Sequence, residues 1–241
     1  MATGMQESYR RFYASATLQA LFSRELSALA PILAGVYGNN GLFLRPHESV
    51  APILPVHLVS HVVDVSPRDD GQFSGAARFD AAELPFVNDS FQLVIAQHAF
   101  ELVNDVDDLA SEVSRVLAPE GVLLVFGFNP LGSWRPWLMS QSMRGARLSL
   151  QSATATTLRF ARQQIDTLQV RYPGLMLPND PAQPPSSYTR WLAQTFGRFG
   201  SSWLLLARKR RSTLTPLRLR SSQRERALNP RLAPGAHRAC A

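Results

Sequence analysis

The stretch that decides the fold is FDAAELPFVNDSFQLVIAQHAFELVNDVDDLASEVSRVLAPEGVLLVFGFNP, residues 79–130. It holds two continuous apolar runs, FQLVIAQ at 91–97 and GVLLVFGF at 121–128. Continuous rather than alternating apolarity is typical of parallel strands that are buried on both faces. The segment between the runs repeats its apolar residues at a helical period, and Asn104 or Asp105 is placed to cap it. A strand, a helix and a second strand in this order predict a right-handed βαβ unit.

The flanking sequence continues the alternation. Further strands are predicted at 41–45, 57–65, 76–79, 167–172 and 202–207, and helices at 13–36, 154–164 and 188–196. We expect Pro31 to kink the first helix or to start a second one, and Gly38-Asn39-Asn40-Gly41 to end it. Pro119-Glu120-Gly121 is expected to stop the helix before the strand at 121–128, and 173–187 is predicted to be a loop.

The basic charge of the chain is concentrated at its C-terminal end. The net charge is +7, but the residues from Arg208 onward carry ten basic side chains and one acidic side chain. The preceding 207 residues carry 15 basic and 17 acidic side chains, so this part is nearly neutral. We therefore predict an N-terminal helical segment at 1–40, an α/β domain at 41–208 and a disordered arginine-rich tail at 209–241.

The composition also excludes several classes of protein. Hydrophobic residues make up 45% of the chain and charged residues 18%, which is a globular composition. The single cysteine, Cys240, excludes an internal disulfide framework and a cysteine-rich zinc site, and we predict no metal site. No apolar run approaches the roughly 18 residues that span a bilayer, and Arg24-Glu25 stand where a signal-peptide cleavage site would be expected. We expect a cytoplasmic protein without a membrane span.

The central stretch resembles the core of class I S-adenosylmethionine-dependent methyltransferases, in particular the type 11 family. The resemblance rests on Asp80, Leu84-Pro85-Phe86, Asp89-Ser90-Phe91, the acid-capped helix and the Pro-Glu-Gly before the next strand. It is strong over 79–130 and extends weakly over 13–208 through the order of the elements. It implies an α/β fold of the Rossmann-like type, a three-layer sandwich with a mostly parallel sheet and an antiparallel C-terminal strand. It also implies S-adenosylmethionine as the cofactor.

The resemblance assigns four residues to cofactor binding: Asp64, Asp80, Ala81 and Gln97. In the family, the carboxylate at the position of Asp80 accepts a hydrogen bond from the adenine amino group. Asp64 ends a predicted strand, where an acid can accept from the ribose hydroxyls as it does in dinucleotide-binding folds. Both residues also have simpler interpretations, Asp80 as a surface turn residue and Asp64 as part of a strand-ending Asp-Val-Ser-Pro turn.

His98 is the candidate catalytic residue. It directly follows the strand at 91–97, at the carboxyl edge where open α/β sheets bind their ligands, and Glu101 lies one turn further on. A histidine at this edge could remove a proton from an oxygen or nitrogen nucleophile. The alternative is that His98 caps the following turn and that Glu101 is solvated.

The chain departs from the family at the first strand, where an acid and a glycine-rich turn are normally found. In one register, Gly35, Gly38 and Gly41 form a degenerate glycine loop after a strand at 31–34. In the preferred register those glycines end the first helix, and the loop after the strand at 41–45 is Arg45-Pro46-His47, without glycine. The preferred register resembles a bacterial branch of the family with a reduced glycine motif. The acid is missing in both registers.

Three functions stay open at this point. The first is a methyltransferase that acts on a small-molecule or protein acceptor. The second, favoured by the missing glycine loop, is a catalytically inactive methyltransferase-fold binding or scaffold protein. The third is a nucleic-acid-modifying protein whose tail arginines neutralise phosphates. A nicotinamide-dependent dehydrogenase is excluded because the Gly-x-Gly-x-x-Gly fingerprint is absent.

Overall fold

The computed structural model of the chain describes residues 2–51, 54–55, 57–67, 72–75, 78–80, 83–146, 148–173 and 200–211. Within these ranges eight strands form one sheet in the order β4-β3-β2-β1-β5-β6-β8-β7. The strands are β1 (Tyr37–Leu44), β2 (Leu58–Pro67), β3 (Gln72–Ser74), β4 (Arg78–Asp80), β5 (Phe91–Gln97), β6 (Leu117–Phe128), β7 (Ile165–Arg171) and β8 (Ser202–Lys209).

The directions of these strands confirm the predicted α/β, Rossmann-like fold. β2, β1, β5 and β6 run parallel, and β8 is antiparallel to both of its neighbours, β6 and β7. The short strand β3 is antiparallel to β2 and β4 and was not predicted. The sheet is therefore mostly parallel, with the antiparallel C-terminal strand that the resemblance implied.

Helix α2 (Ala16–Leu33) covers one face of the sheet. Its buried Leu29 and Leu33 pack against Phe43 of β1 and Ile95 of β5 in one apolar cluster. Burying a leucine side chain contributes about 1.5–3 kcal/mol, so this contact is a main attachment of the helix to the sheet.

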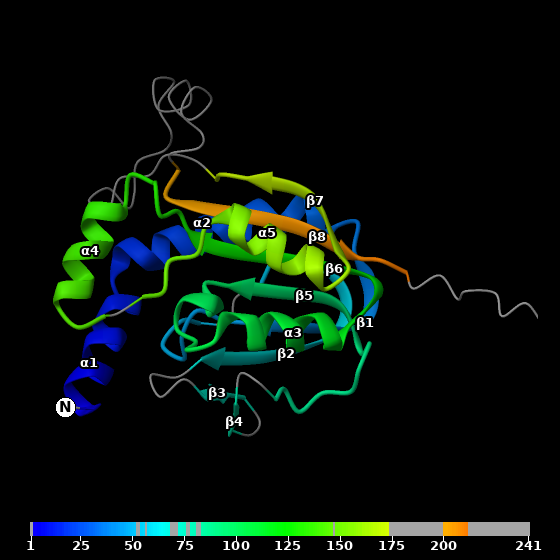
Figure 1. Cartoon of the computed structure of the whole chain (residues 1–241), viewed down its shortest axis with the longest axis horizontal. Helices are drawn as coiled ribbons and strands as arrows, with labels where there is room; N and C mark the ends of the chain where they lie inside the picture. The colour runs from blue at the N-terminus through cyan, green and yellow to red at the C-terminus, as the bar shows by residue number, and fades with distance from the viewer. Residues whose placement is uncertain are drawn as a thin grey trace, which may run out of the picture. The chain divides into compact units, whose positions relative to one another are not determined.

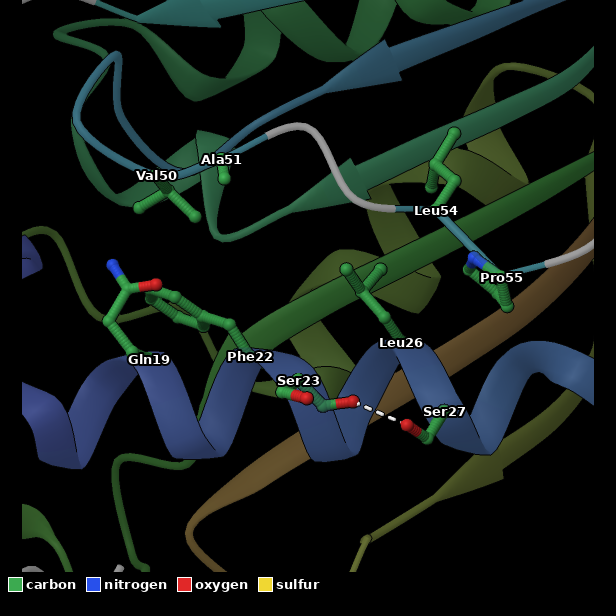
Figure 2. Close-up of a pocket in the computed structure, with 9 residues that line it drawn as sticks. All are labelled: Gln19, Phe22, Ser23, Leu26, Ser27, Val50, Ala51, Leu54 and Pro55. Carbon is green, nitrogen blue, oxygen red and sulfur yellow. Dashed lines mark hydrogen bonds between the residues drawn. The ribbon is translucent and has the colours of Figure 1, made fainter.

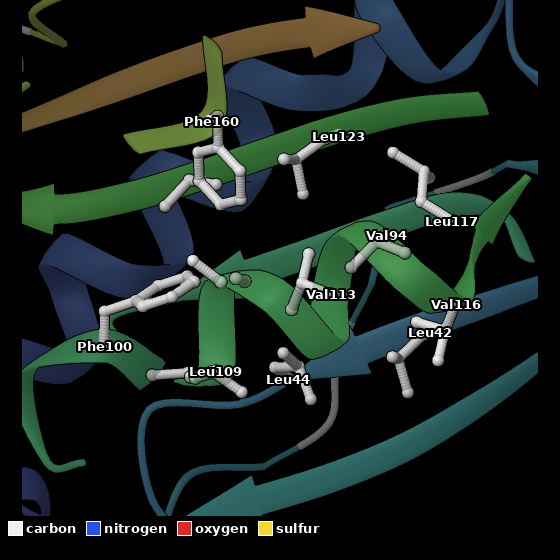
Figure 3. Close-up of a cluster of buried hydrophobic side chains, with 14 of the residues drawn as sticks. Leu42, Leu44, Val94, Phe100, Leu109, Val113, Val116, Leu117, Leu123 and Phe160 are labelled. Atoms are coloured by element: carbon white, nitrogen blue, oxygen red, sulfur yellow. The ribbon is translucent and has the colours of Figure 1, made fainter. Parts of the chain in front are cut away.

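Helices α3 (Val106–Val116) and α5 (Ala153–Arg162) cover the opposite face, which completes the three layers (Figure 1). Figure 3 shows Leu109 and Val113 of α3 among the side chains of the sheet, with Phe160 of α5 nearby. Asp105 caps α3 as predicted, and its carboxylate accepts hydrogen bonds from the backbone N–H groups of the first turn at 2.8 and 3.1 Å. Such a cap stabilises a helix by about 1 kcal/mol.

Helices α1 (Ala2–Tyr13) and α4 (Arg135–Met143) lie beyond the ends of the strands. In Figure 1 the arrowheads of β2, β5 and β6 point toward the side on which these two helices lie. Phe12 of α1, Phe22 of α2, Phe128 of β6 and Leu138 of α4 join one buried cluster at this end of the sheet. The carboxyl ends of the parallel strands are therefore covered by protein.

The structure corrects the prediction for the N-terminal elements. The predicted helix is interrupted at Ala14-Ser15, between α1 and α2. Pro31 lies inside α2 without ending it. Gly38-Asn39-Asn40-Gly41 does not end a helix but forms half of β1. The reason is a long-range contact: Oε1 of Gln92 accepts from the N–H groups of Asn39 and Asn40, and a Cβ on Gly38 would lie 2.7 Å from Cβ of Gln92. Glycine serves close packing here rather than a turn.

A second correction concerns Pro119-Glu120-Gly121. Helix α3 ends at Val116 and β6 begins at Leu117, so these three residues lie within the strand rather than between two elements. The pairing of β6 with β5 shifts register here, because Phe91 pairs with Leu117 whereas Leu93 pairs with Val122. Extra residues in one strand of a pair are accommodated as a bulge.

Some predictions fall on parts of the chain that the structure does not describe. The predicted helix at 188–196, nearly all of the loop at 173–187 and most of the tail at 209–241 lie outside the described residues. Residues 1–211 form one compact unit, which includes the predicted N-terminal helical segment at 1–40. Among the described residues no helix has the length and apolarity needed to cross a membrane.

Candidate cofactor site

The carboxyl ends of β1, β5 and β6 meet at the edge where open α/β folds bind ligands. These strands end at Leu44, Gln97 and Phe128. Asp64 lies on β2, beside Phe43 of β1. The structure therefore brings three of the predicted site residues, Asp64, Gln97 and His98, to the two strands that flank β1 at this edge. Arg45-Pro46-His47 follows β1 directly, as the preferred register predicted, although the glycines of that register lie within β1 rather than at the end of a helix.

Asp64 is bound by Arg45, the first residue after β1. Nε of Arg45 lies 2.6 Å from Oδ1 of Asp64, and the two side chains are 14% and 30% exposed. Nη1 of Arg45 also donates to the carbonyl oxygens of Glu48 and Val50. The carboxylate that is predicted to accept from a ribose thus accepts from a guanidinium of its own chain, in a charge-assisted hydrogen bond.

The bend after β1 is filled by side chains. His47 is completely buried, and its ring stacks on Tyr13 of α1 with centroids 5.0 Å apart and planes 3° apart. The backbone N–H of Ser49 donates to Nδ1 of His47 at 3.1 Å. Where the family has glycines that let the backbone approach a ligand, this chain has a fixed, buried imidazole.

A buried network of four polar side chains joins α2 to the ends of the strands. Glu25 of α2 accepts from Nε2 of His98 and from Nε2 of Gln97, each at 3.0 Å. Glu101, in the short helix η1 (Ala99–Glu101), lies 3.3 Å from Nδ1 of His98 and accepts from the backbone N–H of Phe128 at 2.8 Å. All four polar side chains belong to residues no more than 2% exposed. Buried charges are tolerated when they are paired in this way.

His98 is a cation in this network. Burial alone lowers the pKa of an imidazole, but the carboxylates of Glu25 and Glu101 raise the pKa of His98 to about 10. At neutral pH both ring nitrogens therefore carry protons and donate them to these carboxylates. The backbone of His98 has φ 52°, in the left-handed region, which costs about 1–3 kcal/mol and is held by the surrounding contacts. A proton-accepting role for His98 therefore requires that the imidazolium first release one of these protons.

Gln97 faces α2 rather than an open crevice. It is completely buried, and its Nε2 donates to the carbonyl oxygen of Phe22 at 3.3 Å as well as to Glu25. Within the part of the chain that the structure describes, Oε1 of Gln97 and Oε2 of Glu101 have no hydrogen-bond partner. No three His, Cys, Asp or Glu residues of that part converge as metal ligands.

Aromatic rings cover the network. The rings of Phe22 and Phe128 lie 5.2 and 4.0 Å from the imidazole of His98, measured between centroids. Trp134 stacks on Phe128 at 6.5 Å and is completely buried. The carboxyl edge near β5 and β6 is therefore occupied by the protein's own side chains.

Asp80 lies apart from this edge cluster. It ends the outermost strand β4, and β3 lies between β4 and β2. Asp80 is exposed and lines an open hollow of about 770 Å³ together with Glu83, Glu112 and Arg115. The next residue, Ala81, lies outside the described residues.

The turn that follows Asp80 is fixed by α3. Arg115 donates through Nη2 to the carbonyl oxygen of Leu84 at 2.9 Å and through Nη1 to that of Phe86 at 2.8 Å. Glu112 accepts from the N–H of Leu84, and its hydrogen bond with Arg115 lowers the pKa of the Glu112 carboxyl. The Leu-Pro-Phe turn is therefore held to the α3 side of the sheet.

A second hollow runs between α2 and the connection that leads from β1 to β2. Figure 2 shows it lined by Phe22, Ser23 and Leu26 on the helix and by Val50 and Leu54 opposite. Its volume of about 170 Å³ is below the range of about 300–1,000 Å³ that is usual for ligand pockets. It does not hold a molecule the size of the predicted cofactor without rearrangement.

Sequence reasoning missed Glu25 and Arg45. The signal for Glu25 was its place on the apolar stripe of α2, one turn after Phe22 and one turn before Leu29. An acid on a stripe that faces the core requires a buried partner. The sequence reasoning noted only that the loop at Arg45 lacks a glycine. A charged residue directly after a buried strand also needs a partner, and this signal was not used.

The sheet order and its edge define a class I methyltransferase architecture. Residues 41–125 match the methyltransferase domain family model of type 11. This segment is therefore similar to that family, whose cofactor is S-adenosylmethionine. No curated protein matches the chain in sequence.

Solved structures share the fold at low sequence identity. A Thermotoga maritima protein, described as a SAM-dependent methyltransferase and possible histamine N-methyltransferase, is 15% identical with a TM-score of 0.55, covering 86% of this chain and 100% of its own. A chain of the Haloferax volcanii complex that contains the Trm112 methyltransferase activator is 12% identical with a TM-score of 0.51, covering 87% and 97%. The YcgJ protein of Bacillus subtilis is 14% identical with a TM-score of 0.50, covering 78% and 99%.

The residues do not fit S-adenosylmethionine in this conformation. The Asp64 carboxylate is taken by Arg45, the position of the glycine turn is filled by His47, and Gln97 is bound to α2. A ligand at this edge has to displace at least the Arg45 side chain.

Proposed function

We propose that the chain is an S-adenosylmethionine-dependent methyltransferase that acts on a small-molecule or protein acceptor. The observation that carries the proposal is the family match over 41–125, which runs from the second half of β1 into β6. In this proposal Asp64 accepts from the ribose and Asp80 from the adenine. Methyl transfer from a sulfonium depends chiefly on alignment of the acceptor, so a protonated His98 does not oppose it.

A second candidate function is a methyltransferase-fold protein without catalytic activity that binds a partner. The specific observation in its favour is the filled carboxyl edge, where Arg45 holds Asp64 and the buried His47 replaces the glycine turn. The two candidates differ in one measurable property, which is binding of the cofactor.

Isothermal titration of the full chain with S-adenosylhomocysteine tests the proposal. We expect binding by the wild type, and Asp80→Ala is expected to weaken it by about 1–2 kcal/mol because a hydrogen bond to a charged acceptor is lost. Asp166→Ala is the matched control: Asp166 is also an exposed strand aspartate, but it lies on β7 at the opposite edge of the sheet. Its affinity is expected to equal that of the wild type. No heat from the wild type at millimolar ligand would favour the second candidate.

A further inference from the structure

We propose that Arg45 is an internal competitor for the ribose of the cofactor, and that nucleosides bind only when its guanidinium leaves Asp64. The inference rests on the proposed function, because it concerns the same carboxyl edge. It adds a specific determinant of affinity that lies in this chain's own sequence, at the position where the family carries the glycine turn.

The contacts of Arg45 place it in direct competition. Its Nε donates to Asp64 at 2.6 Å, which is the acceptor that two vicinal hydroxyls would need. A guanidinium–carboxylate bond is charge-assisted and stronger than a bond from a neutral hydroxyl. A ribose therefore meets a carboxylate of which one oxygen, Oδ1, is already bound by a guanidinium.

The same side chain also shapes the bend that covers the edge. Nη1 of Arg45 donates to the carbonyl oxygens of Glu48 and Val50. The bend includes His47, which is stacked on Tyr13 of α1. Release of Arg45 thus frees the carboxylate and, at the same time, removes two hydrogen bonds that hold the bend in place.

The ion pair is exposed enough for the exchange to take place. Asp64 is 30% exposed, so its carboxylate is hydrated when Arg45 leaves and does not become an unpaired buried charge. Removing one partner of an ion pair is costly mainly where the other charge is left buried and unpaired. Removing Arg45 is therefore expected to change ligand affinity more than it changes folding.

The test is titration of wild type and Arg45→Ala with S-adenosylhomocysteine, adenosine and adenine. Arg45→Ala is expected to bind S-adenosylhomocysteine and adenosine at least tenfold more tightly than the wild type does. Adenine has no ribose and is expected to gain nothing. Arg159→Ala is the matched control, because Arg159 of α5 is a similarly buried arginine that pairs with Asp107 of α3. The affinities of Arg159→Ala are expected to equal those of the wild type.

Equal or weaker binding of adenosine by Arg45→Ala would overturn the inference while leaving the proposed function in place. No heat from either protein would reject both. Binding by Arg45→Ala alone would support the competition and assign the wild type to the non-catalytic candidate. Thermal unfolding checks that Arg45→Ala folds. If it does not, Arg45→Gln replaces it, since glutamine removes the charge at similar side-chain length, and the same results support or overturn the inference.

Discussion

Glu25→Ala is expected to lower the free energy of unfolding by about 3–5 kcal/mol, the usual cost of removing one partner from a buried ion pair. Glu25 accepts from His98 and Gln97, and all three side chains are buried. Without the carboxylate, the His98 cation keeps only Glu101 as a charged partner, and Nε2 of Gln97 keeps only the carbonyl oxygen of Phe22 as an acceptor on α2. Chemical denaturation monitored by circular dichroism measures the change.

Glu7→Ala is the matched control for this variant. Glu7 is also a helical glutamate paired with a basic side chain, Arg11, but the two side chains are 62% and 78% exposed. An exposed pair of this kind contributes little, so the control is expected to change stability by less than about 1 kcal/mol. A loss below about 1 kcal/mol for Glu25→Ala itself would mean that the network does not hold α2 on the sheet.

The stability of the protein is expected to fall as the pH rises above about 6.5. His98 has a pKa of about 10 in the folded chain against 6.5 for an ordinary histidine, so the folded state binds the proton more tightly than the unfolded state. The stabilisation is complete below pH 6.5 and is lost between pH 6.5 and 10. One pKa unit corresponds to about 1.4 kcal/mol, so the loss between pH 6.5 and 9 amounts to about 3 kcal/mol.

Denaturation curves from pH 6 to 9 measure this dependence. The charges that face His98 come from Glu25 on α2 and Glu101 on η1, so the slope belongs to this network. His98→Gln removes the titrating group and is expected to be less stable at pH 6.5, with a nearly flat profile above it. A slope in His98→Gln equal to that of the wild type would assign the pH dependence to another group.

The central elements could be predicted because their signals are local. The continuous apolar run at 91–97 became β5 with the predicted bounds, and Asp105 caps α3 as its position before an amphipathic segment indicated. In both cases neighbours in the sequence determine the conformation: burial on both faces for the strand, and unpaired N–H groups for the helix start.

The errors in the fold come from contacts between distant residues. The glycines and asparagines at 38–41 look like a helix end, but the side chain of Gln92, more than fifty residues away, accepts from the N–H groups of Asn39 and Asn40 in β1. The bulge between β5 and β6 likewise depends on the pairing of two strands and not on Pro119-Glu120-Gly121 alone. Turn-forming residues form a turn only where their backbone N–H and C=O groups are not hydrogen-bonded to a neighbouring strand.

The sequence predicted which residues lie at the carboxyl edge but not which side chains they contact. Asp64, Gln97 and His98 were expected at the carboxyl edge, and they lie there. Their partners, Arg45 and Glu25, are 19 and 73 residues away from Asp64 and His98 respectively, so no local pattern could pair them. The raised pKa of His98 comes from Glu25 and Glu101, and the sequence gives no sign that α2 brings Glu25 to this histidine.

A crystal structure of the chain soaked with S-adenosylhomocysteine tests the central claim most directly. The account predicts ligand density at the carboxyl ends of β1 and β2, with ribose hydroxyls on Asp64 and the Arg45 guanidinium moved out of hydrogen-bonding distance. Ligand bound elsewhere, or bound while Arg45 and Asp64 stay paired, would contradict it.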